Sequence, residues 1–124
     1  MVWLAFLQIA LAIVNIPGFK AYLLYGHAIL GLVILGLAHY NNAQIRKTEA
    51  PNRLKRIAKS TATLATIQPI LGIVVFLNLM LNISIAMVWV ITFLHLVIAL
   101  AIITQASSVA TAYDMWEEKE YGGS

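Results

Sequence analysis

Four apolar stretches follow one another along the chain, separated by short polar or turn-forming segments. They cover residues 2–18, 21–40, 57–81 and 83–113. A helix rises about 1.5 Å per residue and the hydrocarbon core of a bilayer is about 30 Å thick, so a stretch of about 20 residues spans it. The pattern therefore predicts an all-α fold, an integral membrane four-helix bundle with up-down topology, formed by residues 1–124 as a single domain.

Proline, glycine and asparagine mark the predicted ends of these stretches. Pro17 and Gly18 end the first one, because proline cannot continue the helical hydrogen-bond ladder and glycine tolerates turn conformations. Asn41 follows the second stretch, and Asn78 and Asn82 mark the turn between the third and the fourth. The first stretch has neither a charged leading segment nor a small-residue cleavage site, so we expect a retained helix rather than a signal peptide.

The segment between the second and third stretches is strongly basic. Six basic residues and a single acidic one, Glu49, lie between Asn41 and Lys59. Short loops rich in lysine and arginine stay on the cytoplasmic side of a membrane. We therefore expect the loop of residues 41–56, the acidic tail of residues 114–124 and both termini to be cytoplasmic, in the cell membrane of a prokaryote. The basic residues are Arg46, Lys47, Arg53, Lys55, Arg56 and Lys59.

The composition strengthens the membrane interpretation and excludes several kinds of site. The chain is 61% hydrophobic and 10% charged, with a mean hydropathy of +0.86, which is far more apolar than a soluble domain. It contains no cysteine, which excludes disulfides, thiolate-bound clusters and the two-cysteine attachment of c-type heme. The net charge of +3 is concentrated in one loop and no basic patch with interleaved aromatic residues is present, so a nucleic-acid partner is not expected.

Two histidines lie inside the apolar stretches. An ionisable ring in such a position is costly, and it usually serves as a ligand or as part of a polar relay. His27 follows Pro17 by about 10 residues and His95 follows Ser84 by about 11, so both would lie roughly 15 Å below the outer surface. Equal depth on two helices predicts that His27 and His95 are the axial ligands of one heme b iron.

Small residues accompany the histidines. Gly31 follows His27 by one helical turn and Ala99 follows His95 by one turn, while Gly72 lies at the same depth on the third stretch. These positions could leave room for a porphyrin, or they could serve close helix packing, as small residues do in membrane proteins. Lys20, on the predicted outer side, could pair with a heme propionate or could reach the membrane surface as an anchor.

Other polar residues in the stretches have alternative interpretations. His39 lies 12 residues from His27, about 18 Å deeper and rotated by roughly 120°, so it cannot bind the same iron and is expected at the membrane interface. Gln8, Gln68 and Gln105 could line a quinone pocket, although hydrogen bonds between helices are favoured for them. Two alternative functions stay open. The protein could be a cofactor-free scaffolding subunit of a respiratory or transport complex, in which His27 and His95 are packing groups. It could also be a transporter in which these two histidines carry protons.

Three short motifs resemble one four-helix half of the heme A synthase family. They are Tyr25-Gly-His27-Ala-Ile-Leu-Gly31-Leu, Thr66-Ile-Gln-Pro-Ile-Leu-Gly72 and Phe93-Leu-His95-Leu-Val-Ile-Ala-Leu100. In that family the histidines of the second and fourth helices bind heme, so the resemblance implies this role for His27 and His95. Family members usually join two such halves in one chain, which implies that this single half forms a homodimer.

The chain also departs from the family in the groups that support its reaction. Many relatives carry a cysteine pair in an outer loop and an acidic residue in the outer part of a half, and this chain has neither. The expected function is therefore that of a stand-alone b-type cytochrome that exchanges electrons with a quinol or a small oxidant. Oxidation of a heme methyl group is not expected, and no catalytic residue is assigned.

Overall fold

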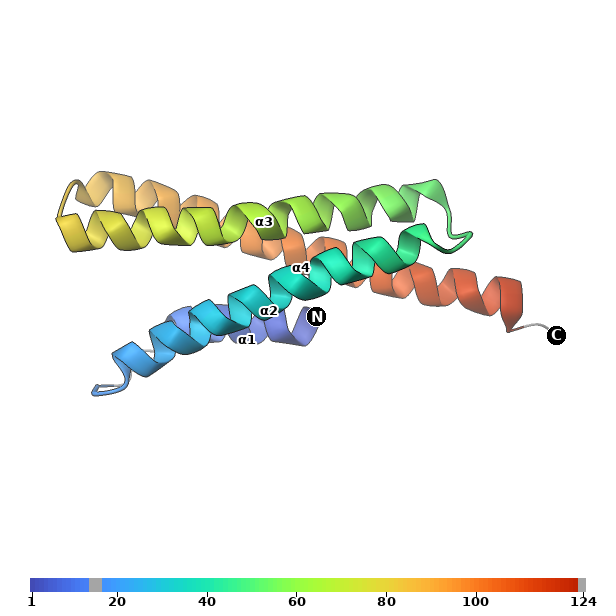
Figure 1. Ribbon diagram of the computed structural model, residues 1–124, viewed down its shortest axis with the longest axis horizontal. Helices are drawn as coiled ribbons and strands as arrows, with labels where there is room; N and C mark the ends of the chain where they lie inside the picture. Colours follow the sequence, from blue (N-terminus) through green and yellow to red (C-terminus); the bar gives the residue numbers. More distant parts are fainter. Residues whose placement is uncertain (14–16, 123–124) are drawn as a thin grey trace.

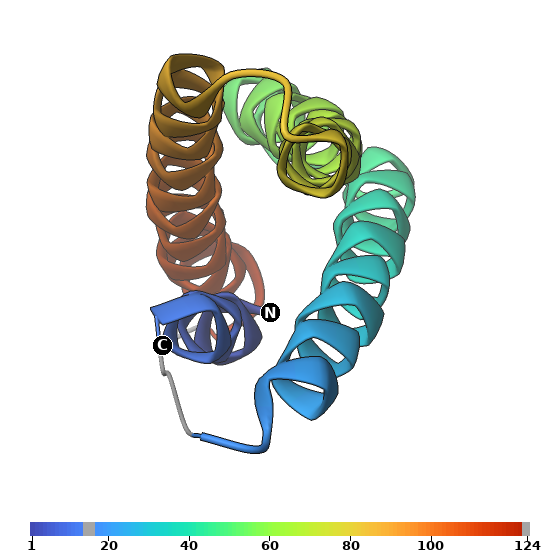
Figure 2. The ribbon, with the colours of Figure 1, turned by 90° about the vertical axis from the view of Figure 1, so that its left-hand side faces the viewer.

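The fold of the described residues is entirely helical apart from short connections. The computed structural model describes residues 1–13 and 17–122, and within them it contains α1 (Val2–Ile13), α2 (Lys20–Arg46), α3 (Asn52–Leu81) and α4 (Ile85–Tyr121) (Figure 1). The predicted all-α class is thus confirmed. Helices α1 and α2, α2 and α3, α3 and α4, and α4 and α1 pack against each other, which places α2 diagonally opposite α4 (Figure 2).

Three of the helices are long and apolar enough to cross a membrane. They are α2, α3 and α4, with 27, 30 and 37 residues. Helix α1 has 12 residues, about 18 Å at the usual helical rise. The predicted first stretch reached residue 18, and its residues 14–16 lie outside the described part of the chain. Helices α2 and α4 continue beyond the predicted apolar stretches, to Arg46 and Tyr121, because the polar residues there also favour helix.

The turns before α2 and between α3 and α4 form where the sequence indicated breaks, whereas Asn41, which was expected to mark the end of the second stretch, lies inside α2. Gly18, in the connection from α1 to α2, has a φ of +83°, a conformation that residues with a side chain rarely adopt. Asn82 ends α3 in the left-handed region, and its backbone N–H donates to the carbonyl of Asn78. Ser84 then caps α4, with its side chain accepting from the N–H of Met87. The two caps together make a tight reversal between α3 and α4.

The connection between α2 and α3 is held by local hydrogen bonds. The Thr48 hydroxyl donates to the carbonyl of Ile45 at 2.7 Å and accepts from the N–H of Ala50 at 3.3 Å. The Lys55 ammonium group donates to the carbonyl of Thr48 at 2.7 Å. These bonds fold the connection back onto the first turn of α3. It lies at the same end of the molecule as the C-terminal part of α4 (Figure 1).

Alanine makes up half of the buried apolar residues, and many large apolar side chains are exposed. One cluster contains Ala38, Ala62, Ala65 and Ile102, contributed by α2, α3 and α4. Trp89 on α4, for example, is 72% exposed, and every helix carries other large apolar residues that are exposed. Small residues at the helix contacts with an apolar exterior are typical of helices that pack within lipid.

A second cluster closes the end of the molecule near the α2–α3 connection. It joins the connection and the start of α3 to the last third of α4, so that the tail of the longest helix is packed rather than free. Its members are Ile45, Ala50, Leu54 and Ala58, packed against Val109, Ala112, Tyr113 and Trp116.

Candidate histidine site

The rings of His27 and His95 face each other across the interior of the molecule. His27 lies on α2 and His95 on the diagonally opposite α4, and their ring centroids are 6.1 Å apart with the planes tilted by 51°. Both side chains are half-buried. Helices α2 and α4 do not pack against each other directly, so the two rings approach each other across the space between these helices.

Gln8 of α1 fixes the position of His27. Its side-chain Nε2 donates to the backbone carbonyl of His27 at 2.7 Å, and His27 Nδ1 lies 3.1 Å from the backbone carbonyl of Gln8. A carbonyl oxygen can only accept, so the proton of the neutral imidazole is on Nδ1. His27 Nε2 therefore keeps its lone pair and is the nitrogen available to a ligand or a metal.

His95 is positioned by two residues of α3. The Nε2 of Gln68 donates to the backbone carbonyl of His95 at 3.0 Å. A Cβ atom added at Gly72 would lie 3.7 Å from Cε1 of His95, which is an ordinary van der Waals contact, so the ring lies beside Gly72 with room for a methyl group between them. Any larger side chain at this position would compete with the ring for the same space.

The two helix pairs repeat the same arrangement. In α1 and α2, Gln8 binds the backbone carbonyl of His27, and in α3 and α4, Gln68 binds that of His95. Each glutamine lies in the helix that precedes the histidine helix. The sequence showed these glutamines as the polar residues within two apolar stretches, but not which histidine each one would reach.

Some buried side-chain polar atoms lack a hydrogen-bond partner among the described residues. They are His95 Nδ1 and the side-chain oxygens of Gln8, Asn42, Gln68 and Asn78. A buried polar atom without a partner costs about 1–3 kcal/mol, and in native proteins it is usually satisfied by water or by a bound ligand. Three of these atoms belong to the histidine and glutamine side chains just described, which indicates a site suited to a further group.

The other predicted site residues lie at varied distances from this centre. A Cβ added at Gly31 would come within 3.0 Å of Nε2 of Gln8, so this glycine makes room for the glutamine of α1. Lys20 is exposed at the first residue of α2, two turns before His27. Ala99 is half-buried one turn after His95. Roles for Gly31, Ala99 and Lys20 toward a cofactor remain predictions.

Two further contacts join neighbouring helices away from the paired histidines. His39 Nε2 lies 2.8 Å from the hydroxyl of Thr66, between α2 and α3. The buried hydroxyl of Thr61 lies 3.0 Å from Oε1 of Gln105 on α4 and 2.9 Å from the Ile57 carbonyl of its own helix, and its one proton can be donated to either oxygen. Gln8, Gln68 and Gln105 thus each contact a neighbouring helix through a polar side-chain atom, which is the interpretation that the sequence favoured.

The donor set fits a heme better than a bare metal ion. Within residues 1–13 and 17–122, no group of three or more histidine, cysteine or carboxylate side chains is arranged to hold a metal ion. Two histidines are nevertheless the complete protein contribution to a bis-histidine heme, because the porphyrin supplies the other ligands. His27 and His95, whose ring centroids are 6.1 Å apart, would be the two residues that hold such a group.

Comparison with known proteins gives no further guide to this site. The function has to be inferred from the chemistry of the two histidines and the residues that hold them. No family model, no curated protein and no solved structure matches the chain.

Proposed function

We propose that the protein is a membrane-embedded b-type cytochrome in which His27 and His95 bind the iron of one heme. The observation that carries this proposal is the convergence of the two rings, 6.1 Å apart, from diagonally opposed helices. When bound, the heme supplies the one-electron couple of its iron. A low-spin iron with two histidine ligands has no open position, so it favours electron transfer over oxygen binding.

The surrounding residues prepare the two histidines for this role. Gln8 holds the proton of His27 on Nδ1 through its backbone carbonyl and thereby leaves Nε2 free for iron. Gln68 fixes the helical position of His95 through the backbone carbonyl of that residue. The His95 ring lies beside Gly72 of α3. Partners that orient a metal-binding histidine in this way commonly change metal affinity by about 10–100-fold.

The proposed setting is an up-down four-helix bundle in the cell membrane of a prokaryote. Three helices long and apolar enough to cross a membrane, and an exterior of large apolar side chains, support the membrane location. The basic connection between α2 and α3 supports a cytoplasmic position for that end of the molecule and for the end of α4 beside it (Figure 1). An up-down arrangement of four spans would place the N-terminus on the same side. In this setting the chain would correspond to one half of a heme A synthase, and a homodimer would restore the two-half arrangement.

Electron exchange with a quinol or a small oxidant is proposed in preference to heme methyl oxidation. Among the described residues, the carboxylates lie in the α2–α3 connection, as Glu49, or in the last third of α4, from Asp114 onward. The histidines lie much nearer to the opposite end of the helices. Thr92, one turn before His95, would be a poor general base at neutral pH. Co-expression with a heme O source followed by mass analysis of extracted pigment tests this choice, and a hydroxylated or formyl product would overturn it.

The absorption spectrum of the purified protein tests the heme itself. The protein made with sufficient heme supply should show a reducible Soret band typical of bis-histidine ligation. His27→Ala and His95→Ala should each abolish stable binding, since one ligand is lost. The matched control is His39→Ala, which removes a histidine bonded to Thr66 and should leave the spectrum unchanged. A bis-histidine spectrum in either of the first two variants would refute the ligand assignment.

The same preparation separates this function from that of a cofactor-free scaffolding subunit. A scaffolding subunit would be colourless after heme supply, and added heme would not change the thermal stability of the wild type or of the His27→Ala and His95→Ala variants. In a heme protein, added heme should colour the wild type and raise its thermal stability, and both effects should be lost in the two variants, because a ligand that binds only the folded state stabilises it.

A further inference from the structure

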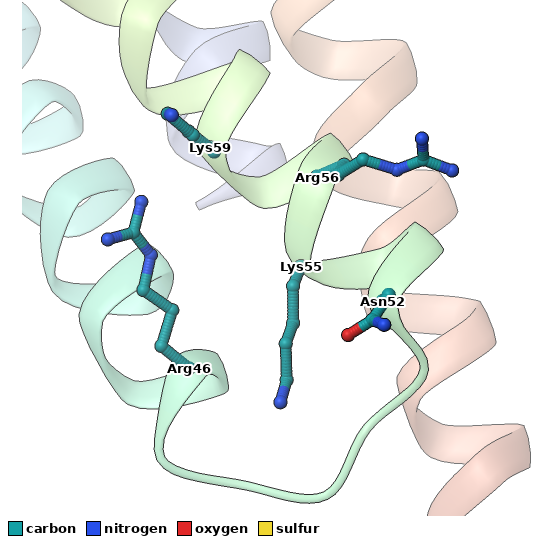
Figure 3. A pocket seen from close by; sticks show the side chains of 5 residues that line it. All are labelled: Arg46, Asn52, Lys55, Arg56 and Lys59. Carbon is teal, nitrogen blue, oxygen red and sulfur yellow. The ribbon is translucent and has the colours of Figure 1, made fainter.

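A hollow lined by positive charges lies between the end of α2 and the start of α3. Its volume is about 620 Å³, and it is lined by Arg46, Asn52, Lys55, Arg56 and Lys59. Figure 3 shows Arg46 on α2 extending toward the side of α3 that carries Lys59, whereas Arg56 points away from Arg46. Lys55 extends along the hollow toward the connection, where its ammonium group donates to the carbonyl of Thr48.

The positive charges around this hollow are not balanced by any acidic residue that lines it. Its lining residues include four cations and no carboxylate. The first turn of α3 contains no acidic residue, and Pro51 makes no side-chain cap with the helix start. Basic side chains close to a helix N-terminus repel its positive dipole end. An anion bound among Arg46, Lys55 and Lys59 would relieve this repulsion.

The face shared by α2 and α3 changes from charged to apolar with distance from the hollow. Seven residues from Arg46 and Lys59, about 10 Å along the antiparallel helices, lie His39 and Thr66, which are hydrogen-bonded to each other. Seven residues further along each helix lie Leu32 and Ile73, which are 62% and 59% exposed. The order is therefore cationic, then polar, then apolar, at steps of about 10 Å.

This order matches the sequence of groups in a phospholipid at a membrane surface. The interfacial region on each side of a bilayer is on the order of 5–8 Å thick, and the hydrocarbon begins below it. A small soluble anion would use the cations alone and would gain nothing from the exposed apolar side chains below them. Basic sites between helices on the cytoplasmic side are also well suited to anionic headgroups.

We propose that the hollow binds the phosphodiester headgroup of an anionic phospholipid, with an acyl chain passing His39 and Thr66 to reach Leu32 and Ile73. Arg46 and Lys59 contact the phosphate from the two helices. Lys55 contributes a third positive charge while it holds the α2–α3 connection. The inference depends on α2 and α3 lying in a membrane and is independent of heme.

Native mass spectrometry in mild detergent tests this site with phosphatidylglycerol as the probe and phosphatidylcholine as the neutral comparison. We expect the wild-type protein to retain phosphatidylglycerol preferentially. The double variant Arg46→Gln, Lys59→Gln should lower its apparent affinity by about tenfold, because two phosphate contacts are lost. The matched control is Lys47→Gln, Arg53→Gln, which removes the same net charge at two positions that do not line the hollow and should change the affinity by less than about twofold.

Three outcomes would overturn the proposal. Equal loss of lipid in the two double variants would mean that binding follows net charge rather than this hollow. Equal retention of phosphatidylcholine would show that no anionic headgroup is recognised. Displacement of the lipid by inorganic phosphate or glycerol phosphate at millimolar concentration would assign the hollow to a small soluble anion.

If the double variant unfolds, the single variants Arg46→Gln and Lys59→Gln provide the test. Each should show a smaller loss of lipid affinity than expected for the double variant, and unchanged binding in both would refute the site.

Discussion

Gln8 and His27 are joined by two hydrogen bonds, one from the glutamine side chain to the histidine carbonyl at 2.7 Å and one between His27 Nδ1 and the glutamine carbonyl at 3.1 Å. The second bond fixes the tautomer of the ring, and the first holds the backbone that carries it. Because both come from α1, the shortest helix orients a side chain of α2 at the centre of the molecule.

The first prediction concerns the side chain of Gln8. Gln8→Leu removes the bond to the His27 carbonyl but keeps the backbone carbonyl that accepts from Nδ1. We expect heme affinity to fall by about tenfold, at the lower end of the effects of orienting partners. Heme titration into the apoprotein, followed by the Soret absorbance, measures this change. Gln105→Leu is the control, since Gln105 bonds to Thr61 and should leave heme affinity unaltered.

The second prediction compares two glycines of α2. At Gly31 an added Cβ would lie 3.0 Å from Nε2 of Gln8, whereas at Gly36 it would meet no described atom within 4 Å. Gly31→Ala should push the glutamine amide from its position and lower both the melting temperature and heme affinity. Gly36→Ala should be neutral or stabilising by up to about 1 kcal/mol, because alanine is the better helix former.

A double variant separates this mechanism from a general effect on helix packing. In a Gln8→Ala background the contact that Gly31→Ala disturbs is already absent. The alanine at position 31 should then cause a smaller loss of stability than in the wild type. Additive losses would show that Gly31 acts through some other neighbour.

The third prediction addresses the hydrogen bond between α3 and α4. Thr61 is 4% exposed, and its hydroxyl lies 3.0 Å from Oε1 of Gln105 and 2.9 Å from the Ile57 carbonyl of its own helix. Thr61→Val should reduce the free energy of unfolding by about 0.6–2 kcal/mol, the usual range for polar contacts between membrane helices. Thr63→Val should have little effect, since that exposed hydroxyl bonds only to the Lys59 carbonyl of its own helix. Equal losses in the two variants, measured by reversible unfolding in detergent, would contradict the role of the interhelical bond.

The fourth prediction concerns orientation in the membrane. The chain contains no cysteine, so each introduced cysteine gives a background-free signal. Asn52→Cys, at the start of α3, should be protected from a membrane-impermeant reagent in intact cells, because the basic connection is expected inside. Ile83→Cys, in the turn between α3 and α4, should be labelled. The reverse pattern would mean that the bundle is inserted the other way.

The fifth prediction concerns assembly. A single four-helix unit with extensive exposed apolar surface should pair with a second copy about a closed two-fold axis. Native mass spectrometry in mild detergent should show a dimer. A purely monomeric species that still binds heme would show that one unit is sufficient.

The sequence predicted much of the helical architecture because the apolar stretches favour helices and the residues between them favour turns. Pro17, Gly18 and the asparagines of the α3–α4 turn lie where the apolar pattern stops, and their backbone preferences require breaks there. The pairing of His27 with His95 could also be anticipated, since two antiparallel hairpins bring residues of equal depth together. Helix ends were less certain, because α2 and α4 continue through polar residues that carry no hydrophobic signal.

The contacts around the histidines could not be read from the pattern. Depth along a helix follows from residue spacing, but the neighbour that a side chain faces depends on how the helices are rotated about their axes. The sequence therefore offered Gly31 as space for a porphyrin, whereas in the structure the side chain of Gln8 lies against it. It also left His39 without a partner, although Thr66 on the next helix lies within hydrogen-bond distance.

The cluster that joins the α2–α3 connection to the last third of α4 has a consequence for biosynthesis. Tyr113 and Trp116 pack against the cluster that contains Ala50 and Leu54, yet they are translated only after all of α3 and most of α4. At roughly 5–20 residues per second, the ribosome takes several seconds to cover this gap. During that interval the basic connection is already made and available to fix which way the hairpin inserts, while its packing partners do not yet exist. This end of the molecule can therefore close only after the whole α3 segment and most of α4 have been made.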